Sequence, residues 1–67
     1  MKVKVLKVRF ERSLVNDLTY LKRSIVQHGI LFPILVDYDL NVVDGKRRVQ
    51  ACIDLGIEEI EAILVTG

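Results

Sequence analysis

The side chains best suited to chemistry gather in one short run, residues 44–48, with the sequence DGKRR. Gly45 lets the backbone approach a ligand closely because it has no Cβ. Arg47 and Arg48 can each offer forked donors to phosphate oxygens, and Lys46 adds a third positive charge. The run therefore predicts a phosphate-binding site made by Gly45 and the three basic residues after it.

The elements on either side of this run support the prediction. Residues 40–43 form an apolar run typical of a strand, and residues 46–55 have the spacing of a helix with Val49, Cys52 and Ile53 facing inward. The first turn of a helix has unpaired N–H groups and the positive end of the dipole, which suits an anion. Basic residues oppose that dipole, so helix stability does not explain their position.

Two further side chains are candidates for catalysis. Asp44 can cap the second helix, or it can hold Mg²⁺ beside bound phosphates, and we favour the cap. His28 ends the first predicted helix, where its charge would favour the dipole, and it is also a candidate for proton transfer. Asp44 and His28 are thus candidates only, and the sequence predicts no metal site.

The remaining segments supply the elements that position this run. Alternating residues 2–10 predict a strand. A first helix is predicted with Ser13 as its N-cap and Gly29 as its C-cap in the left-handed region. Its apolar stripe consists of Leu14, Leu18, Leu21 and Ile25. Further predicted features are a strand over residues 34–38, a turn over residues 37–41, a helix end at Gly56 and a strand over residues 60–65.

The predicted order is strand, helix, strand, strand, helix, strand, which defines an α/β (α+β) fold. The chain has 67 residues without a linker, repeat or low-complexity segment, so residues 1–67 are expected to form one domain. On pattern alone the first choice is a ferredoxin-like split βαβ sandwich. Periodicity does not distinguish that arrangement from other α/β folds with the same order of elements.

A set of short motifs adds a family resemblance. In chain order they are Ser24-Ile25, Gly29, Pro33 to Val36, Gly45 with Arg47 and Arg48, Ala51, and Leu55-Gly56. The set resembles the N-terminal domain of the ParB/sulfiredoxin superfamily over roughly residues 13 to 65. The resemblance implies that the glycine–arginine box cradles nucleotide phosphates and that Gly29 lies beside the same pocket. It also implies a ParB/sulfiredoxin-like fold.

Three departures from the family pattern concern catalysis. Lys46 stands where ParB proteins usually have glutamate, and where sulfiredoxins have the reactive cysteine, so sulfinic-acid reductase activity is not expected. The hydrolysing members carry an acidic box in a helix beyond the fourth strand. The sequence ends at Gly67, before such a helix, so the catalytic acid is expected to be absent unless another subunit supplies it.

Composition limits the class of partner. The net charge is only +1, so anion affinity must come from a local cluster. The single cysteine, Cys52, excludes an internal disulfide and is interpreted as a core residue. No apolar run approaches the roughly 18 residues of a membrane span, so a cytoplasmic protein without a membrane partner is expected. A homodimer is favoured over a monomer because so short a domain buries only about 60% of its unfolded surface.

Three hypotheses for function remain open at this stage. The first is a ParB-like binding module that holds a nucleotide or nucleic-acid backbone, with a role in DNA partition or transcriptional regulation; its ligand would be a nucleoside triphosphate or diphosphate with Mg²⁺, or DNA. The second is a small metal-dependent nuclease or nucleotide phosphohydrolase that uses Asp44. The third is a protein-interaction domain. We favour binding. Tyr20, Phe32 and Tyr38 could stack on bases if exposed, but we interpret them as core or rim residues.

Overall fold

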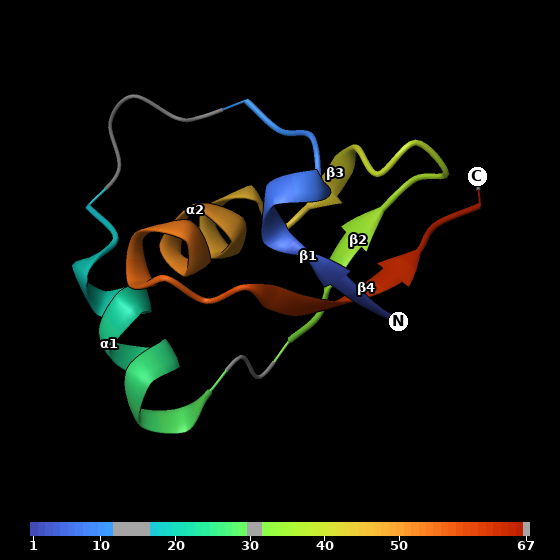
Figure 1. Cartoon of the computed structure of the whole chain (residues 1–67). Coiled ribbons are helices and arrows are strands. Elements are labelled where there is room, and N and C mark those ends of the chain that lie inside the picture. The colour runs from blue at the N-terminus through green and yellow to red at the C-terminus, as the bar shows by residue number, and fades with distance from the viewer. Residues whose placement is uncertain (12–16, 30–31, 67) are drawn as a thin grey trace.

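The computed structural model describes residues 1–11, 17–29 and 32–66. Strands and helices follow one another in the predicted order, with one short 3-10 helix added (Figure 1). The elements are β1 (Lys2–Lys4), η1 (Val5–Lys7), α1 (Thr19–His28), β2 (Ile34–Val36), β3 (Val42–Asp44), α2 (Lys46–Leu55) and β4 (Glu59–Leu64).

The four strands form one mixed sheet in the order β1-β4-β2-β3. β4 runs parallel to β2, whereas the β1–β4 and β2–β3 pairs are antiparallel. It follows that α1 joins two strands of opposite direction, β1 and β2, and that α2 likewise joins β3 to β4. A split βαβ unit joins parallel strands through its helix, so the ferredoxin-like alternative is wrong.

The N-terminal strand is shorter than predicted. β1 pairs with β4 over three residues, and the chain then enters η1. Val5 and Val8 are both buried and lie three positions apart, which fits one turn of a 3-10 helix rather than the alternation of a strand. The predicted strand over residues 2–10 is therefore wrong beyond Lys4.

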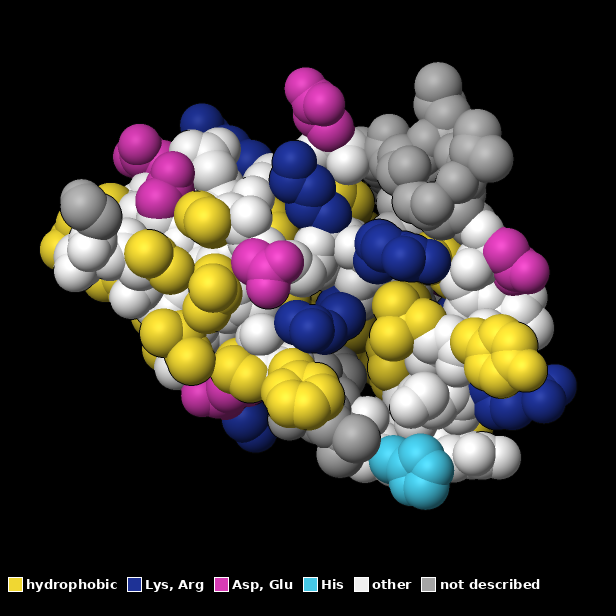
Figure 2. All heavy atoms as spheres, turned by 180° about the vertical axis from the view of Figure 1, so that it is seen from behind, with side chains coloured by type: hydrophobic (Ala, Val, Ile, Leu, Met, Phe, Trp, Pro, Cys, Tyr) yellow, Lys and Arg dark blue, Asp and Glu magenta, His cyan; other side chains and the backbone are white. Residues whose placement is uncertain are grey.

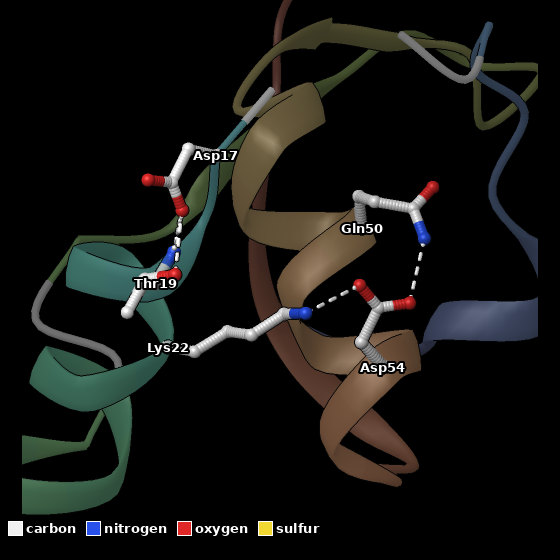
Figure 3. Close-up of polar contacts among 5 residues, drawn as sticks. All are labelled: Asp17, Thr19, Lys22, Gln50 and Asp54. Atoms are coloured by element: carbon white, nitrogen blue, oxygen red, sulfur yellow. Dashed lines mark hydrogen bonds and ion pairs between the residues drawn. The ribbon is translucent and has the colours of Figure 1, made fainter. Parts of the chain in front are cut away.

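The first helix begins later than predicted. Its first residue is Thr19, and the predicted cap Ser13 and Leu14 lie outside the described residues. The side chain of Asp17 accepts hydrogen bonds from the backbone N–H and the hydroxyl of Thr19 (Figure 3). A carboxylate here satisfies an N–H of the first turn and favours the helix dipole. The predicted helix end is confirmed, because the Gly29 N–H donates to the Ile25 carbonyl at 2.8 Å, with φ 76° at the glycine.

β2 and β3 form a hairpin closed by the predicted turn. The Asp37 carboxylate accepts hydrogen bonds from the Asn41 side chain, from the Asn41 N–H and from the Asp39 N–H. These bonds, the Asn41 side chain first, hold the pKa of Asp37 below its ordinary value. Because Asp37 is committed to this turn, β2 ends at Val36 instead of Tyr38.

α2 forms over its predicted residues and supplies much of the core. Val49 and Cys52 are fully buried against the sheet, in a cluster with Ile34, Val36, Val42, Ile60, Ala62, Val5 and Val8. Ile53 is half-buried beside this cluster, so the predicted inward face is confirmed. Gly56 ends the helix in the left-handed region, also as predicted. β4 lies one residue earlier than predicted, at Glu59–Leu64, with Ile60 and Ala62 buried on the helix side.

α1 packs on α2 through a smaller apolar cluster of Leu18, Ile25 and Ala51. Polar contacts lie beside this cluster: Lys22 pairs with Asp54 at 2.9 Å, and Gln50 donates to the same carboxylate at 2.9 Å (Figure 3). The Lys22–Asp54 pair connects the two helices at the surface, the Gln50–Asp54 bond lies within α2, and both leave the start of α2 uninvolved. In the described part of the chain, neither helix combines the length and apolar character needed to cross a bilayer.

Candidate functional site

The turn between β3 and α2 is built around Gly45. This residue is the N-cap of α2 and has φ 101° and ψ 20°, which L side chains rarely adopt. A Cβ at this position would lie 2.7 Å from Ile34 Cγ2 and 3.1 Å from Ile34 Cβ. Gly45 therefore brings the start of α2 directly against the buried strand β2. The close backbone approach in this structure is thus to Ile34.

The first turn of α2 presents donors without a competing cap. Its first internal hydrogen bond joins the Val49 N–H to the Gly45 carbonyl at 3.1 Å. The N–H groups of residues 46–48 precede that bond and have no partner within the helix. Among the described residues, no side chain caps this turn, and none of its own residues is acidic. The turn can therefore donate to an external anion.

Three basic side chains surround this turn. Lys46 and Arg47 are exposed and Arg48 is half-buried. All three line a surface depression of about 420 Å³ together with Val43, Asp44 and Gly45. Figure 2 shows dark-blue Lys and Arg side chains gathered near the middle of one face of the molecule, with acidic and apolar side chains beside them. The predicted arginines thus lie at a hollow of the surface.

Arg48 is anchored to the segment that leads into β2. Its Nη1 donates to the Pro33 carbonyl at 3.2 Å, and its guanidinium carbon lies 5.6 Å from the centroid of the Phe32 ring. These two contacts join the proline motif to the glycine–arginine box, which are separate pieces of the sequence. From the sequence, Phe32 is interpreted only as a core or rim residue, because nothing in the spacing places it next to Arg48.

Asp44 does not cap α2. It is the last residue of β3, opposite Leu35 in the register, and Gly45 takes the cap position. The favoured interpretation of Asp44 as an N-cap is therefore wrong, because the strand continues through it. Asp44 is exposed and lines the same depression as the basic side chains. Three positive charges and this one carboxylate leave a local charge of +2 (3 − 1).

His28 and Gly29 lie at the end of α1, and neither is among the described residues that line the depression. His28 is exposed, and a Cβ on Gly29 would meet nothing within 4 Å. Phe32, the first described residue after Gly29, contacts Arg48. A role for Gly29 or His28 in ligand binding stays a prediction.

Carboxylates that could serve a metal are dispersed over the described residues, where no group of three or more His, Cys, Asp or Glu side chains could hold a metal ion. Glu59 and Glu61 lie in β4 opposite Lys4 and Lys2. Glu58 lines a different pocket, near Gly56 at the other end of α2. Asp44 alone does not make a metal site, so any Mg²⁺ here would be held mainly by the phosphates of a ligand.

Cys52 is a fully buried residue of the core, as predicted. Burial raises the pKa of its thiol. A thiol that stays protonated is a poor nucleophile, so Cys52 adds no chemistry to the depression.

Comparison with known proteins agrees with the fold and with the sequence motifs. The ParB N-terminal domain model matches residues 2–66. An uncharacterized protein, ORF326b, of Acidianus two-tailed virus is 36% identical over 44 residues, which is 66% of this chain and 14% of the viral protein. A solved Pnob8-like ParB-N domain has a TM-score of 0.80 at 20% identity and covers 96% of this chain, which spans 28% of that one. With a family match over nearly its whole length, the chain belongs to the ParB N-terminal domain family.

Proposed function

We propose that this domain binds the phosphates of a nucleotide or of a nucleic-acid backbone at Gly45, Lys46, Arg47 and Arg48. The observation that carries the proposal is the uncapped first turn of α2, whose three basic side chains line one depression. Backbone N–H groups and the dipole attract the anion, while the side chains supply charge-assisted hydrogen bonds. Binding of this kind positions a phosphate without reading base sequence.

Membership of the ParB N-terminal domain family supports a ligand related to DNA. We place the function in DNA partition or transcriptional regulation in the cytoplasm. The chain spans only 14% and 28% of the two similar proteins, so this wider role belongs to the proposal. Binding is favoured over hydrolysis because Asp44 is the one carboxylate among the described residues that line the depression. Phosphoryl transfer needs a positioned nucleophile and more charge neutralisation than one acid provides.

The test compares two double variants that remove the same charge. Lys46→Ala with Arg47→Ala changes the depression, and Lys7→Ala with Arg23→Ala removes two exposed cations elsewhere. Thermal shifts would be measured with nucleoside triphosphates, nucleoside diphosphates, short DNA and inorganic pyrophosphate, with and without Mg²⁺ at two salt concentrations. A ligand that binds the native state raises the midpoint temperature of thermal unfolding.

We expect the first double variant to bind at least about tenfold more weakly, since each charge-assisted hydrogen bond contributes about 1.5–3 kcal/mol. The second should bind like the wild type. The association constant for DNA should fall steeply with salt concentration. On a duplex, a plot of its logarithm against the logarithm of salt concentration should have a slope of about −0.9 per phosphate contact. Equal affinity in the two double variants would reject the site. A wild-type domain that binds none of these ligands would leave the protein-interaction hypothesis in its place.

A further inference from the structure

We infer that Phe32 is a positioning residue of the phosphate site, acting through Arg48. The inference rests on the proposed function, and it assigns different roles to the two arginines. Arg47 is exposed, whereas Arg48 is half-buried between its own helix and the start of β2. Arg48 is the basic residue of the turn whose guanidinium has two described contacts.

The two contacts hold different parts of the guanidinium. The Pro33 carbonyl accepts a hydrogen bond from Nη1 at 3.2 Å. The Phe32 ring lies within cation–π distance, at 5.6 Å from the guanidinium carbon to the ring centroid. An arginine has five N–H donors, so one is used and four remain. The planar fork can still bind an oxyanion in a bidentate manner, on an edge directed away from the Pro33 carbonyl.

Restraint of Arg48 before the ligand arrives lowers the entropy that binding must remove. Long basic side chains such as Lys46 and Arg47 lose rotamer freedom when they close on a phosphate. Arg48 has already lost part of that freedom through Phe32 and Pro33. The same contacts hold the segment before β2 against the first turn of α2. Phe32 thus contributes to affinity without contacting the phosphate.

Its exposure also points away from a core role. Phe32 is 64% exposed, so the ring is not needed to fill the interior. Tyr20 is 88% exposed, on α1, and serves as a matched aromatic control. Phe32→Leu keeps the apolar side chain but removes the ring, and Phe32→Tyr restores the ring. Neither substitution changes a charge.

Inorganic pyrophosphate is the probe, because it has no base that could stack on the ring. We expect Phe32→Leu to weaken pyrophosphate binding about two- to fivefold, which corresponds to about 0.5–1 kcal/mol for an exposed cation–π contact. Phe32→Tyr and Tyr20→Leu should bind like the wild type. In an Arg48→Ala background, Phe32→Leu should have no further effect, because the residue through which it acts is gone.

A second measurement reports on the contact without any ligand. The NMR signals of the Arg48 guanidinium should shift in Phe32→Leu and stay unchanged in Tyr20→Leu. Unchanged pyrophosphate affinity in Phe32→Leu, or an equal loss in the Arg48→Ala background, overturns the inference while the phosphate site stands. Absence of pyrophosphate binding by the wild-type domain overturns the inference alone if nucleotides or DNA still bind. It overturns the proposed function as well if they do not, and the NMR shift then reports only a structural contact.

Discussion

The two helices of this domain are equally long, ten residues each, and each ends at a glycine, but they begin differently. α1 starts beside Asp17, whose carboxylate accepts two hydrogen bonds from Thr19. α2 starts after Gly45 with three basic residues, and no described side chain caps its first turn. One helix begins with the charge that its dipole favours and the other with the charge that its dipole opposes.

This difference separates a fold requirement from a ligand requirement. The start of α1 satisfies a backbone N–H with a side chain of the same chain. The start of α2 keeps its N–H groups available and adds cations that weaken the helix slightly. The fold requires Gly45 whether or not a ligand binds, because of its positive φ and its contact with Ile34. Substitutions at these three places should therefore affect stability and binding in different ways.

Gly45→Ala should have the largest effect, and the effect should be on stability. The strained φ costs about 1–2 kcal/mol for an L residue, and the 2.7 Å approach to Ile34 adds about 1–3 kcal/mol of overpacking. The expected loss is about 2–5 kcal/mol. A domain of this length has about 3–10 kcal/mol of stability, so a large part of it would disappear. Urea denaturation followed by circular dichroism measures the change.

Gly56→Ala is the control for the overpacking. Gly56 has φ 75°, but a Cβ there would meet nothing within 4 Å. Its substitution should therefore cost only the conformational part, about 1–2 kcal/mol. If both variants lose the same free energy of unfolding, overpacking against Ile34 adds no cost. Gly45 is then needed only for its backbone conformation.

The contrast between the helices was only partly visible in the sequence. The bounds of α2 were predicted correctly because its apolar spacing and Gly56 agree. The start of α1 was placed at Ser13, because Asp17 and Thr19 have no periodic signal that reveals a cap. Periodicity also missed the turn at Val5, where a valine pattern compatible with a strand continues into a 3-10 helix. Sheet order depends on pairing between distant segments, which local pattern does not encode.

The candidate site shows the same division. Lys46, Arg47 and Arg48 were found from composition and from their place after a strand and a glycine, and the structure places all three at one depression. The contacts of Arg48 with Phe32 and Pro33 could not be predicted, because they join residues 15 or more positions apart through the packing of β2 on α2. The prediction that Asp44 caps α2 is wrong because β3 extends one residue further than predicted. Asp44 is its last residue, and Gly45 takes the cap position.

Asp17→Ala should have a smaller effect than Gly45→Ala, and that effect should depend on pH. Hydrogen bonds from the Thr19 hydroxyl, and then from its N–H, hold the pKa of Asp17 below its ordinary value of 3.8. A lowered pKa in the folded state means that the stabilisation is present above the ordinary value and is lost as pH falls through the folded value. The stability difference between wild type and variant should be constant near pH 7 and shrink below about pH 3.8.

Comparison of the two proteins at each pH isolates this carboxylate. Asp37 also has a lowered pKa, but it titrates in both proteins and its contribution cancels in the difference. Urea midpoints at a series of pH values provide the measurement. A difference that persists unchanged at the lowest pH would mean that Asp17 stabilises α1 by packing rather than by its charge, and the contrast with α2 would lose its electrostatic basis.

Arg47→Glu should have the smallest effect on stability, in the opposite direction. Arginine in the first turn opposes the dipole and glutamate favours it, each by about 0.3–1 kcal/mol, so the variant should be more stable by about 1 kcal/mol. The same substitution places a carboxylate where we propose a phosphate binds, so pyrophosphate binding should be lost. Arg23→Glu, in the middle of α1, makes the same charge change away from a helix start and should show neither effect.

A gain in stability coupled to a loss of binding is the signature that a fold-only role for Arg47 cannot produce. An arginine that served the fold would destabilise it when reversed in charge. Urea midpoints and pyrophosphate titrations of both variants distinguish the two cases. If Arg47→Glu is less stable than the wild type, then the start of α2 depends on its arginine just as α1 depends on Asp17, and the two helices no longer differ in the way that supports a ligand site.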